Sequence, residues 1–170
     1  MPNINAESPE LELAGVVELA DDAATARIGA ALGAALAPGD AALLLGSLGA
    51  GKTALARAAI AARLRMAGRP PEDIPSPTFT LIQVYEADAP IWHADLYRLD
   101  GEDEVLELGL DEAFADAIVF VEWPEKLGAL APTRRLELSL TAPAKGGRRL
   151  DWRGKGGGWG RVAAVLERAS

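Results

Sequence analysis

The most informative segment of the sequence is Gly46-Ser47-Leu48-Gly49-Ala50-Gly51-Lys52-Thr53. It fits the pattern G-x-x-x-x-G-K-[ST] at every fixed position. Glycines allow positive φ angles, so backbone amides can turn inward around an anion, and the dipole of a following helix adds positive potential. The lysine of this pattern reaches β- and γ-phosphates, and the threonine hydroxyl ligates Mg²⁺. We therefore predict a phosphate-binding loop (P-loop) with nucleotide-binding residues Gly46, Leu48, Gly49, Ala50, Gly51, Lys52, Thr53 and Ala54.

The sequence on either side of this loop supports the prediction. Residues 41–45 form a short apolar run, which is typical of a buried parallel strand. Residues 52–66 are rich in Ala, Leu and Arg, which favours a helix. A strand before the loop and a helix after it distinguish a P-loop from an ordinary glycine-rich turn.

On both sides of the loop, strand-like and helix-like segments alternate along the chain. Asp21 or Asp22 can cap a helix whose apolar residues recur every fourth position until Pro38-Gly39-Asp40 ends it. We predict strands at 16–19, 41–45, 79–85, 91–96 and 118–121, helices at 52–66, 102–117 and 159–169, and a hairpin of 136–140 with 148–152. The prediction is one α/β domain over 1–170, with a P-loop NTPase-like three-layer fold, a mostly parallel central sheet and a C-terminal antiparallel hairpin.

Composition restricts the classes of function. The length of 170 residues suits one domain, and the chain has no cysteine, which excludes disulfides, thiolate metal sites and cysteine nucleophiles. The segment Met1 to Glu10 lacks a basic region followed by an apolar run, so it does not resemble a secretory signal. The charge-free apolar stretches 28–39 and 41–51 are too short to cross a bilayer. We expect a cytoplasmic protein without a membrane partner.

Charge is distributed unevenly along the chain. Residues 1–132 carry 8 basic and 22 acidic side chains, whereas residues 133–170 carry 9 basic and 3 acidic ones. The acidic part of the chain, residues 1–132, is expected to bind nucleic acid poorly by itself. The basic C-terminal segment either contacts RNA or an acidic partner, or forms an ordinary solvated surface.

A P-loop site requires a carboxylate near its metal ion, usually at the end of a neighbouring strand. Glu122 ends the apolar run 118–121, and Asp95 follows the run 91–94. One of them would hold Mg²⁺ and the other would orient the attacking water, and the sequence leaves open which acid orients the water. The predicted catalytic residues are Lys52, Asp95 and Glu122, and Thr53 is a predicted metal ligand. Trp123 lies either beside the nucleotide or in the core.

The nucleotide is predicted from residues that the sequence lacks. Guanine recognition by Ras-type GTPases uses N-K-x-D, and the only asparagines here are Asn3 and Asn5. The only glutamine, Gln83, lies in a predicted strand, so it does not suit the water-orienting role that glutamine has in Ras. ATP is therefore favoured over GTP.

Several polar residues outside the loop are candidate sensors. Hydroxyls of Ser76, Thr78 and Thr80 could sense a γ-phosphate, as mobile switch loops do, or form a turn before a strand. Arg98 could stabilise a transferring phosphate or pair with Asp100. The only histidine, His93, is expected to be structural because it lies in a predicted strand.

Four blocks in order resemble the TsaE (YjeE) ATPases: the loop itself, Ser76-Pro77-Thr78-Phe79-Thr80-Leu81, His93-Ala94-Asp95-Leu96-Tyr97-Arg98-Leu99 and Val121-Glu122-Trp123-Pro124-Glu125. The run Glu107-Leu108-Gly109-Leu110-Asp111-Glu112 is similar to the family pattern as well. The resemblance implies Mg-dependent ATP hydrolysis that supports synthesis of threonylcarbamoyladenosine (t6A) at adenosine 37 of tRNA, together with the proteins TsaD and TsaB. It also implies that Glu122 is a metal ligand, that Asp95 supports hydrolysis, and that Leu19, Asp21 and Thr25 lie at the adenine end. Ala94 departs from the family, which usually has a bulky aromatic residue there.

The sequence is also compatible with two other functions. A small-molecule kinase would use the same loop, metal and acid, but kinases also need an acceptor pocket and usually an Arg-rich lid. The cluster Arg63, Arg65 and Arg69 is the only resemblance to such a lid in the central region. A binding module that senses ATP without hydrolysing it is the second alternative.

Overall fold

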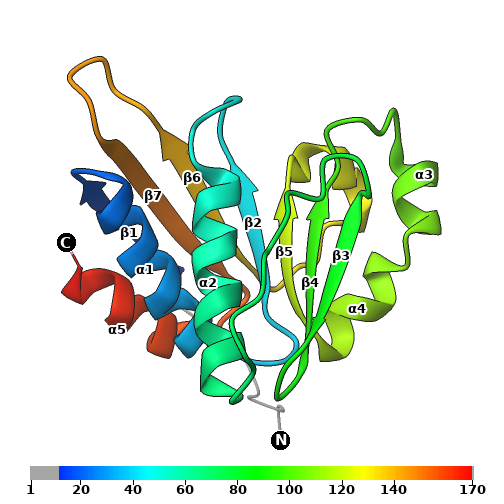
Figure 1. The fold of residues 1–170 in the computed structure, drawn as a ribbon. Helices are drawn as coiled ribbons and strands as arrows, with labels where there is room; N and C mark the ends of the chain where they lie inside the picture. The colour runs from blue at the N-terminus through cyan, green and yellow to red at the C-terminus, as the bar shows by residue number, and fades with distance from the viewer. Residues whose placement is uncertain (1–11, 170) are drawn as a thin grey trace, which may run out of the picture.

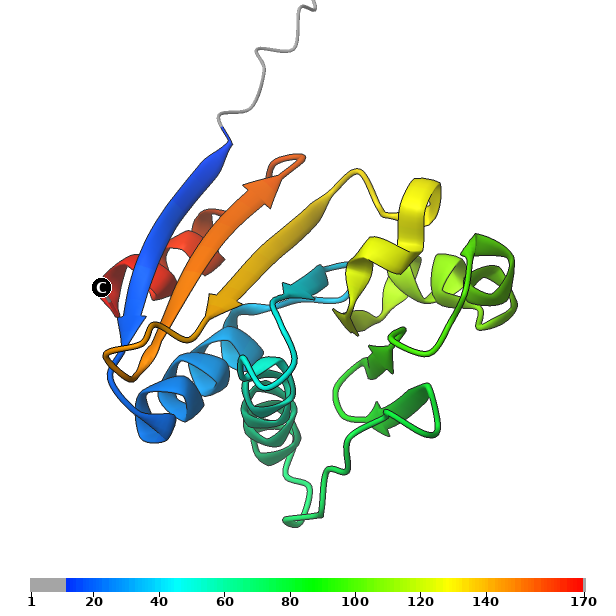
Figure 2. The same cartoon turned by 90° about the horizontal axis from the view of Figure 1, so that it is seen from above.

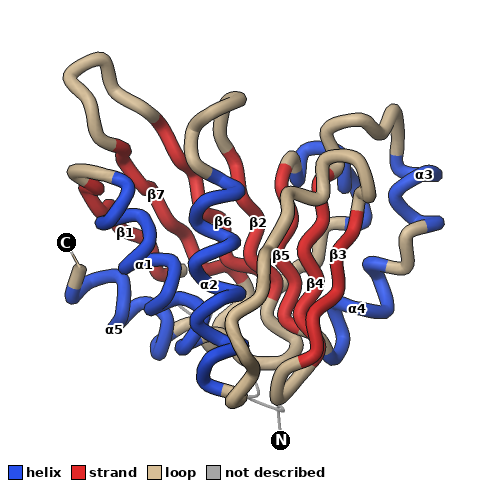
Figure 3. The backbone as a smooth tube through the Cα atoms, viewed as in Figure 1, coloured by secondary structure: helices blue, strands red, loops and turns tan. Residues whose placement is uncertain are grey.

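The computed structural model describes residues 12–169. Residues 1–11, which include the segment Met1 to Glu10 discussed above, and Ser170 lie outside the described residues. Its centre is a seven-stranded sheet with the order β1-β7-β6-β2-β5-β4-β3 (Figures 1 and 3). The strands are β1 (Leu13–Leu19), β2 (Ala41–Leu45), β3 (Ile82–Glu86), β4 (Pro90–Asp95), β5 (Ile118–Glu122), β6 (Arg135–Thr141) and β7 (Arg148–Lys155). The helices are α1 (Asp22–Ala35), α2 (Lys52–Met66), α3 (Glu102–Glu107), α4 (Leu110–Asp116), the 3₁₀ helix η1 (Pro124–Leu130) and α5 (Gly160–Arg168).

The sheet is mixed, so the predicted mostly parallel sheet is wrong for half of the strand pairings. Strands β6, β2, β5 and β4 run parallel to one another, whereas β1–β7, β7–β6 and β4–β3 are antiparallel. Short connections join β3 to β4 and β6 to β7, and a short connection permits only an antiparallel pair. The predicted C-terminal hairpin is confirmed, and β1 adds a third antiparallel strand to it.

Helices cover the sheet in layers because successive side chains of a strand point to opposite faces. Ala42 and Leu44 of β2 belong to the core under α1, α2 and α5, whereas Leu43 belongs to a second core under α3, α4 and η1. Figure 2 shows the two helical layers on either side of the sheet. Within residues 12–169, β1, β7 and β6 carry helices on one face only. The predicted three layers therefore exist only in the other part of the sheet, which begins at β2.

Most predicted elements differ from the structure by one to three residues at an end, and β7, for example, ends at Lys155 rather than at 152. Backbone conformation explains two of the differences. The predicted helix 102–117 is divided into α3 and α4 because Gly109 adopts a left-handed conformation with φ of 76°. The predicted strand 79–85 begins only at Ile82, since Leu81 has φ of 67° and its amide donates to the Pro77 carbonyl in a turn. By contrast, Asp21 caps α1 as predicted, accepting the Ala24 amide at 2.7 Å.

Helix α2 is held in place by unusually close contact with α1. A Cβ atom built on Gly33 would lie 2.1 Å from the Ala59 carbonyl oxygen, and one on Gly29 would lie 2.7 Å from the Leu55 carbonyl oxygen. The two backbones therefore approach to a distance that only glycine permits. Since α2 begins where the glycine-rich loop ends, this contact also fixes the position of the loop.

Arg63 anchors the same pair of helices to the β3–β4 turn. Its guanidinium donates to the carbonyls of Gly33 and Leu36 at the end of α1, and to the carboxylate of Asp88. The hydrogen bond from Arg63 is the main reason that the pKa of Asp88 lies below its ordinary value. Arg63 is buried, so it does not belong to a solvent-exposed lid of the kind that a kinase would need.

We expect Arg63→Ala to lower the free energy of unfolding by about 2 kcal/mol, because it leaves two carbonyls at a helix end without a partner. Urea denaturation measures this difference. Arg65→Ala removes an exposed arginine from the same helix and is the matched control. Equal stability of the two variants would contradict the anchoring role.

Candidate nucleotide site

The glycine-rich loop connects β2 to α2 and has the backbone conformation that its sequence predicts. Gly46, Gly49 and Gly51 have φ angles of 144°, 79° and 109°, which side-chain-bearing residues rarely adopt. Gly51 precedes the first turn of α2, where backbone amides have no partner within the helix. Leu48 is 80% exposed at the tip of the loop. Such a loop can surround an anion with backbone donors.

Lys52 lies inside this loop. Its Nζ atom donates to the carbonyls of Gly46 and Ser47 at 2.6 and 2.9 Å, and it lies 4.1 Å from the centre of the Trp123 ring. Burial lowers the pKa of Lys52, while the negative charges of Glu122, Glu125 and Asp95 oppose that shift. The loop carbonyls thus hold an ammonium group at the place where phosphate would arrive.

The two predicted carboxylates lie side by side. Strands β4 and β5 are parallel neighbours whose register pairs Asp95 with Glu122 at their carboxyl ends. The Thr53 hydroxyl, in the first turn of α2, donates to Glu122 Oε1 at 2.6 Å. The structure therefore brings together the two residues that the sequence predicts as metal ligands, although they are 69 positions apart.

Asp95 has its own set of partners. Its Oδ1 accepts the Tyr97 amide at 3.0 Å, and its Oδ2 accepts the Thr78 hydroxyl at 3.2 Å. Ser76 joins this chain through a hydroxyl contact of 2.7 Å with Thr78. Two of the predicted sensors, Ser76 and Thr78, therefore connect to the site through a carboxylate.

The other two predicted sensors point elsewhere. Thr80 is exposed and accepts a hydrogen bond from Gln83 at 2.9 Å. The guanidinium of Arg98 lies 4.3 Å from the centre of the Phe79 ring, in the segment just before β3. Neither residue lines the cavity beside the loop.

This cavity has a volume of about 200 Å³ and collects most of the predicted site. It is lined by Leu48, Gly49, Gly51, Lys52, Thr53, Ala54, Thr78, Asp95, Glu122 and Trp123. Gly46 contributes the carbonyl that holds Lys52, and Ala50 is buried within the loop.

The residues predicted at the adenine end, Leu19, Asp21 and Thr25, do not line this cavity. Thr25 is linked to the loop through Arg148, which donates to Asp22 and Thr25 and lies against the backbone of Gly51. Sequence reasoning missed Arg148, because nothing in the pair Arg148-Arg149 at the start of a strand indicates a contact with a loop about 100 positions earlier.

His93 is the second residue that sequence reasoning undervalued. It is completely buried on β4, and its Nε2 atom lies 2.9 Å from Glu122 Oε2. A signal existed in the sequence: His93 and Asp95 are two positions apart on a strand, so their side chains point to the same face of the sheet.

Trp123 adopts an unexpected left-handed backbone conformation, with φ of 58°, directly after Glu122. Backbone outliers of this kind cluster at functional sites.

Ala94, which departs from the family pattern, is fully buried in the second core, where Leu81 and Ile82 also pack. Neighbouring side chains therefore cover the position that a larger residue would fill. Ala94 and Asp95 are adjacent on β4 and point to opposite faces of the sheet, so the departure leaves Asp95 in its register with Glu122.

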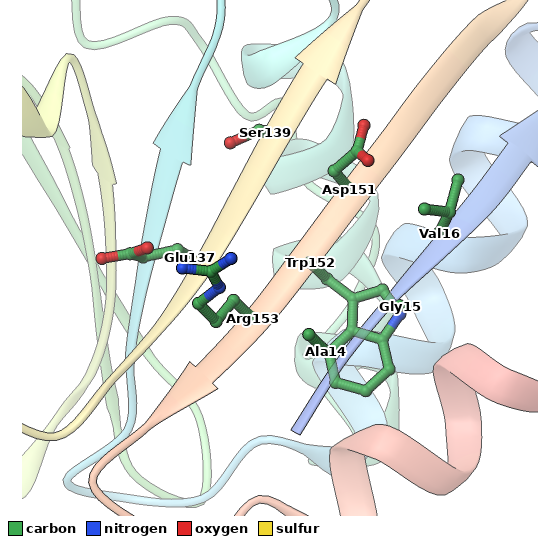
Figure 4. Close-up of a pocket in the computed structure, with 8 residues that line it drawn as sticks. All are labelled: Ala14, Gly15, Val16, Glu137, Ser139, Asp151, Trp152 and Arg153. Atoms are coloured by element: carbon green, nitrogen blue, oxygen red, sulfur yellow. The ribbon is translucent and has the colours of Figure 1, made fainter. Parts of the chain in front are cut away.

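A wider hollow of about 520 Å³ lies on the helix-free face of β1, β7 and β6 (Figure 4). Charged side chains on this face pair across the sheet and along it, as Arg149 does with Asp151 at 2.9 Å. The hollow is lined by Ala14, Gly15, Val16, Glu137, Ser139, Asp151, Trp152 and Arg153, so it shares no residue with the cavity beside the loop. Its paired charges and open form are those of a solvated sheet face.

The basic segment 133–170 is largely neutralised by its own neighbours. Six of its nine basic residues form ion pairs with acids: Arg134, Arg135, Arg148, Arg149, Arg153 and Lys155. This pairing favours the solvated-surface interpretation over a strong RNA-binding patch.

Within residues 12–169, no three His, Asp or Glu side chains gather into a metal-binding cluster. Mg²⁺ does not require one, because it is commonly held by one or two carboxylates, by water and by the phosphates of a nucleotide. The buried carboxylate of Glu122 and the hydroxyl of Thr53 are oxygen donors of the kind that could hold the ion. No helix in the described part of the chain has the length and apolar character to cross a membrane.

Comparison with known families decides the assignment. The family model for the threonylcarbamoyl adenosine biosynthesis protein TsaE matches residues 19–150, which include the loop, Asp95 and Glu122. This chain belongs to the TsaE family. The predicted resemblance is therefore confirmed.

Curated TsaE relatives, each a tRNA threonylcarbamoyladenosine biosynthesis protein, come from several bacteria. The Rickettsia bellii protein is 40% identical over 65% of this chain and 74% of its own length. The Nostoc sp. protein is 38% identical over 78% of this chain and 82% of its own length. The Treponema pallidum protein is 32% identical over 74% of this chain and 90% of its own length.

Among solved structures, that of the Bacillus protein YdiB matches with a TM-score of 0.69 and 24% identity, covering 93% of this chain and 95% of YdiB. This last match supports the fold alone.

Proposed function

We propose that this TsaE-family chain is a Mg-dependent P-loop ATPase that supports t6A formation at adenosine 37 of tRNA by acting on a TsaD–TsaB assembly. The observation that carries the ATPase proposal is the hydrogen bond from Thr53 to Glu122, made beside Lys52 in one cavity. The family and its relatives support the role in tRNA modification. The partners are those that the family resemblance implies.

The arrangement suits binding of a nucleotide triphosphate. Lys52 would exchange its two loop carbonyls for phosphate oxygens, and the loop amides would donate to the same phosphates. Thr53 and Glu122 would hold Mg²⁺, which supplies charge neutralisation at the β- and γ-phosphates. Trp123 would lie alongside the phosphates because it already contacts Lys52.

Hydrolysis would depend on positioning and on charge. Glu122 is bonded to Thr53, whose hydroxyl would ligate the ion, so we assign Glu122 to Mg²⁺ and the orientation of water to Asp95. The water oxygen bonds to the γ-phosphorus, and the bond from that phosphorus to the β–γ bridging oxygen breaks. ADP leaves, and the protons of the water end on inorganic phosphate and in solvent. Thr78, whose hydroxyl donates to Asp95, would respond to the γ-phosphate.

The proposed function also implies a location and a relation to tRNA. The protein would act in the cytoplasm, and it would meet tRNA only indirectly or through segment 133–170. The local ion pairs of that segment favour the indirect route.

Glu122→Gln tests this proposal. We expect ATP hydrolysis to fall by about 100-fold, because the metal site and its charge stabilisation are lost, while ATP affinity without Mg²⁺ stays within about three-fold. Phosphate release and calorimetry measure the two quantities. Glu125→Gln is the control, since it removes a nearby exposed charge that also acts on Lys52 but lies outside the cavity. Full hydrolysis by Glu122→Gln would contradict the assignment.

A further inference from the structure

His93 is a buried polar residue with no part in the mechanism above beyond its contact with Glu122. Both residues are almost inaccessible, with exposed fractions of 0% for His93 and 2% for Glu122. The ring reaches Glu122 Oε2 from β4, while Thr53 reaches Oε1 from α2. The carboxylate is therefore held between two different elements of the fold, one partner on each oxygen.

The surroundings of the ring select one tautomer. Nδ1 is buried and has no hydrogen-bond partner among the described residues. With its proton on Nε2, the ring donates to the carboxylate and leaves only a lone pair unsatisfied at Nδ1. The other tautomer would turn a lone pair toward the carboxylate and bury an N–H group without an acceptor, which costs more.

A donor at this position has a specific effect on Glu122. The terminal torsion of a glutamate side chain is broad and has no sharply preferred angle. A single hydrogen bond from Thr53 would leave the carboxylate plane free to turn, whereas a second bond to the other oxygen fixes it. Partners that orient a ligand in this way strongly affect metal affinity.

We propose that His93 is a positioning residue whose Nε2–H donor aims Glu122, and that it thereby sets the affinity of the nucleotide complex for Mg²⁺. The proposal rests on the proposed function, because it requires Glu122 and Thr53 to hold that ion. His93 itself does not contact the nucleotide.

Two amide substitutions at this position both remove the ring but differ in whether a donor remains at the position of Nε2. His93→Gln places an amide nitrogen at the position of Nε2, whereas His93→Asn places one at the position of Nδ1. The probe is ADP, titrated by calorimetry with and without Mg²⁺. We expect the gain in ADP affinity on adding Mg²⁺ to fall by at least about 10-fold in His93→Asn and to stay within about three-fold in His93→Gln. Affinity for ADP alone should be equal in both variants and in the wild type.

The outcomes distinguish positioning from a merely structural role. An unchanged Mg²⁺ effect in a folded His93→Asn protein overturns the proposal, and so does an equal loss of affinity with and without the ion. Wild-type protein that binds no ADP would instead defeat the proposed function, and this proposal with it.

A spectroscopic test needs no variant. His93 is the only histidine of the sequence, so ¹⁵N-histidine labelling gives the signals of one ring. We expect an Nε2-protonated ring whose Nε2 signal shifts when Mg²⁺ is added to the ADP complex. An Nδ1-protonated ring, or an Nε2 signal that does not respond to the ion, overturns the proposal even if His93→Asn fails to fold.

Discussion

Lys52→Ala is expected to weaken the binding of Mg·ATP by about 100-fold or more. The side chain supplies the buried charge of the loop, and charge-assisted hydrogen bonds to phosphate are worth about 1.5–3 kcal/mol each. A loss of about 2.7 kcal/mol corresponds to a factor of about 100. The two carbonyls that now hold Nζ cannot replace it, because they are acceptors and phosphate is an anion.

Calorimetric titration with Mg·ATP measures this effect. Lys145→Ala is the control, since it removes an exposed lysine from the turn between β6 and β7. Binding by Lys52→Ala at the affinity of the control would show that the loop is only a turn before a helix.

Gly33→Ala is expected to lower the free energy of unfolding by about 3 kcal/mol, since overpacking against a rigid backbone costs about 1–3 kcal/mol or more. The new methyl group would overlap the Ala59 carbonyl oxygen of α2, so the two helices must separate. For a chain of this length the melting temperature should drop by about 10 °C. Nucleotide affinity should fall too, because α2 carries Lys52 and Thr53.

Gly160→Ala is the matched control for this change. A methyl group at Gly160, the first residue of α5, meets nothing within 4 Å. Both substitutions favour a helix intrinsically, so only the contact between α1 and α2 distinguishes them. Melting curves for the two variants that coincide would contradict the close packing inferred here.

The parts of the site that the sequence predicts correctly have local signals. Gly46 to Thr53 follow a fixed spacing, and buried runs before Asp95 and Glu122 place both acids at strand ends. Because parallel strands end at the same edge of a sheet, these acids meet although they are far apart along the chain.

The parts that the sequence does not predict depend on tertiary contacts. The left-handed conformations of Leu81 and Trp123 occur in residues that rarely adopt them, so composition gives no warning. The role of Arg63 depends on carbonyls of α1 that lie some 30 positions earlier. Likewise, the antiparallel addition of β1 to β7 joins opposite ends of the described chain and has no local pattern.

The central claim is that the site couples ATP hydrolysis to a partner assembly. Its most direct test is phosphate release from Mg·ATP by the purified protein, first alone and then with TsaD and TsaB. We expect slow release by the protein alone and faster release with the partners. Bound ATP without release in either condition would contradict it and favour an ATP-sensing module, and a phosphorylated acceptor in place of free phosphate would favour a kinase.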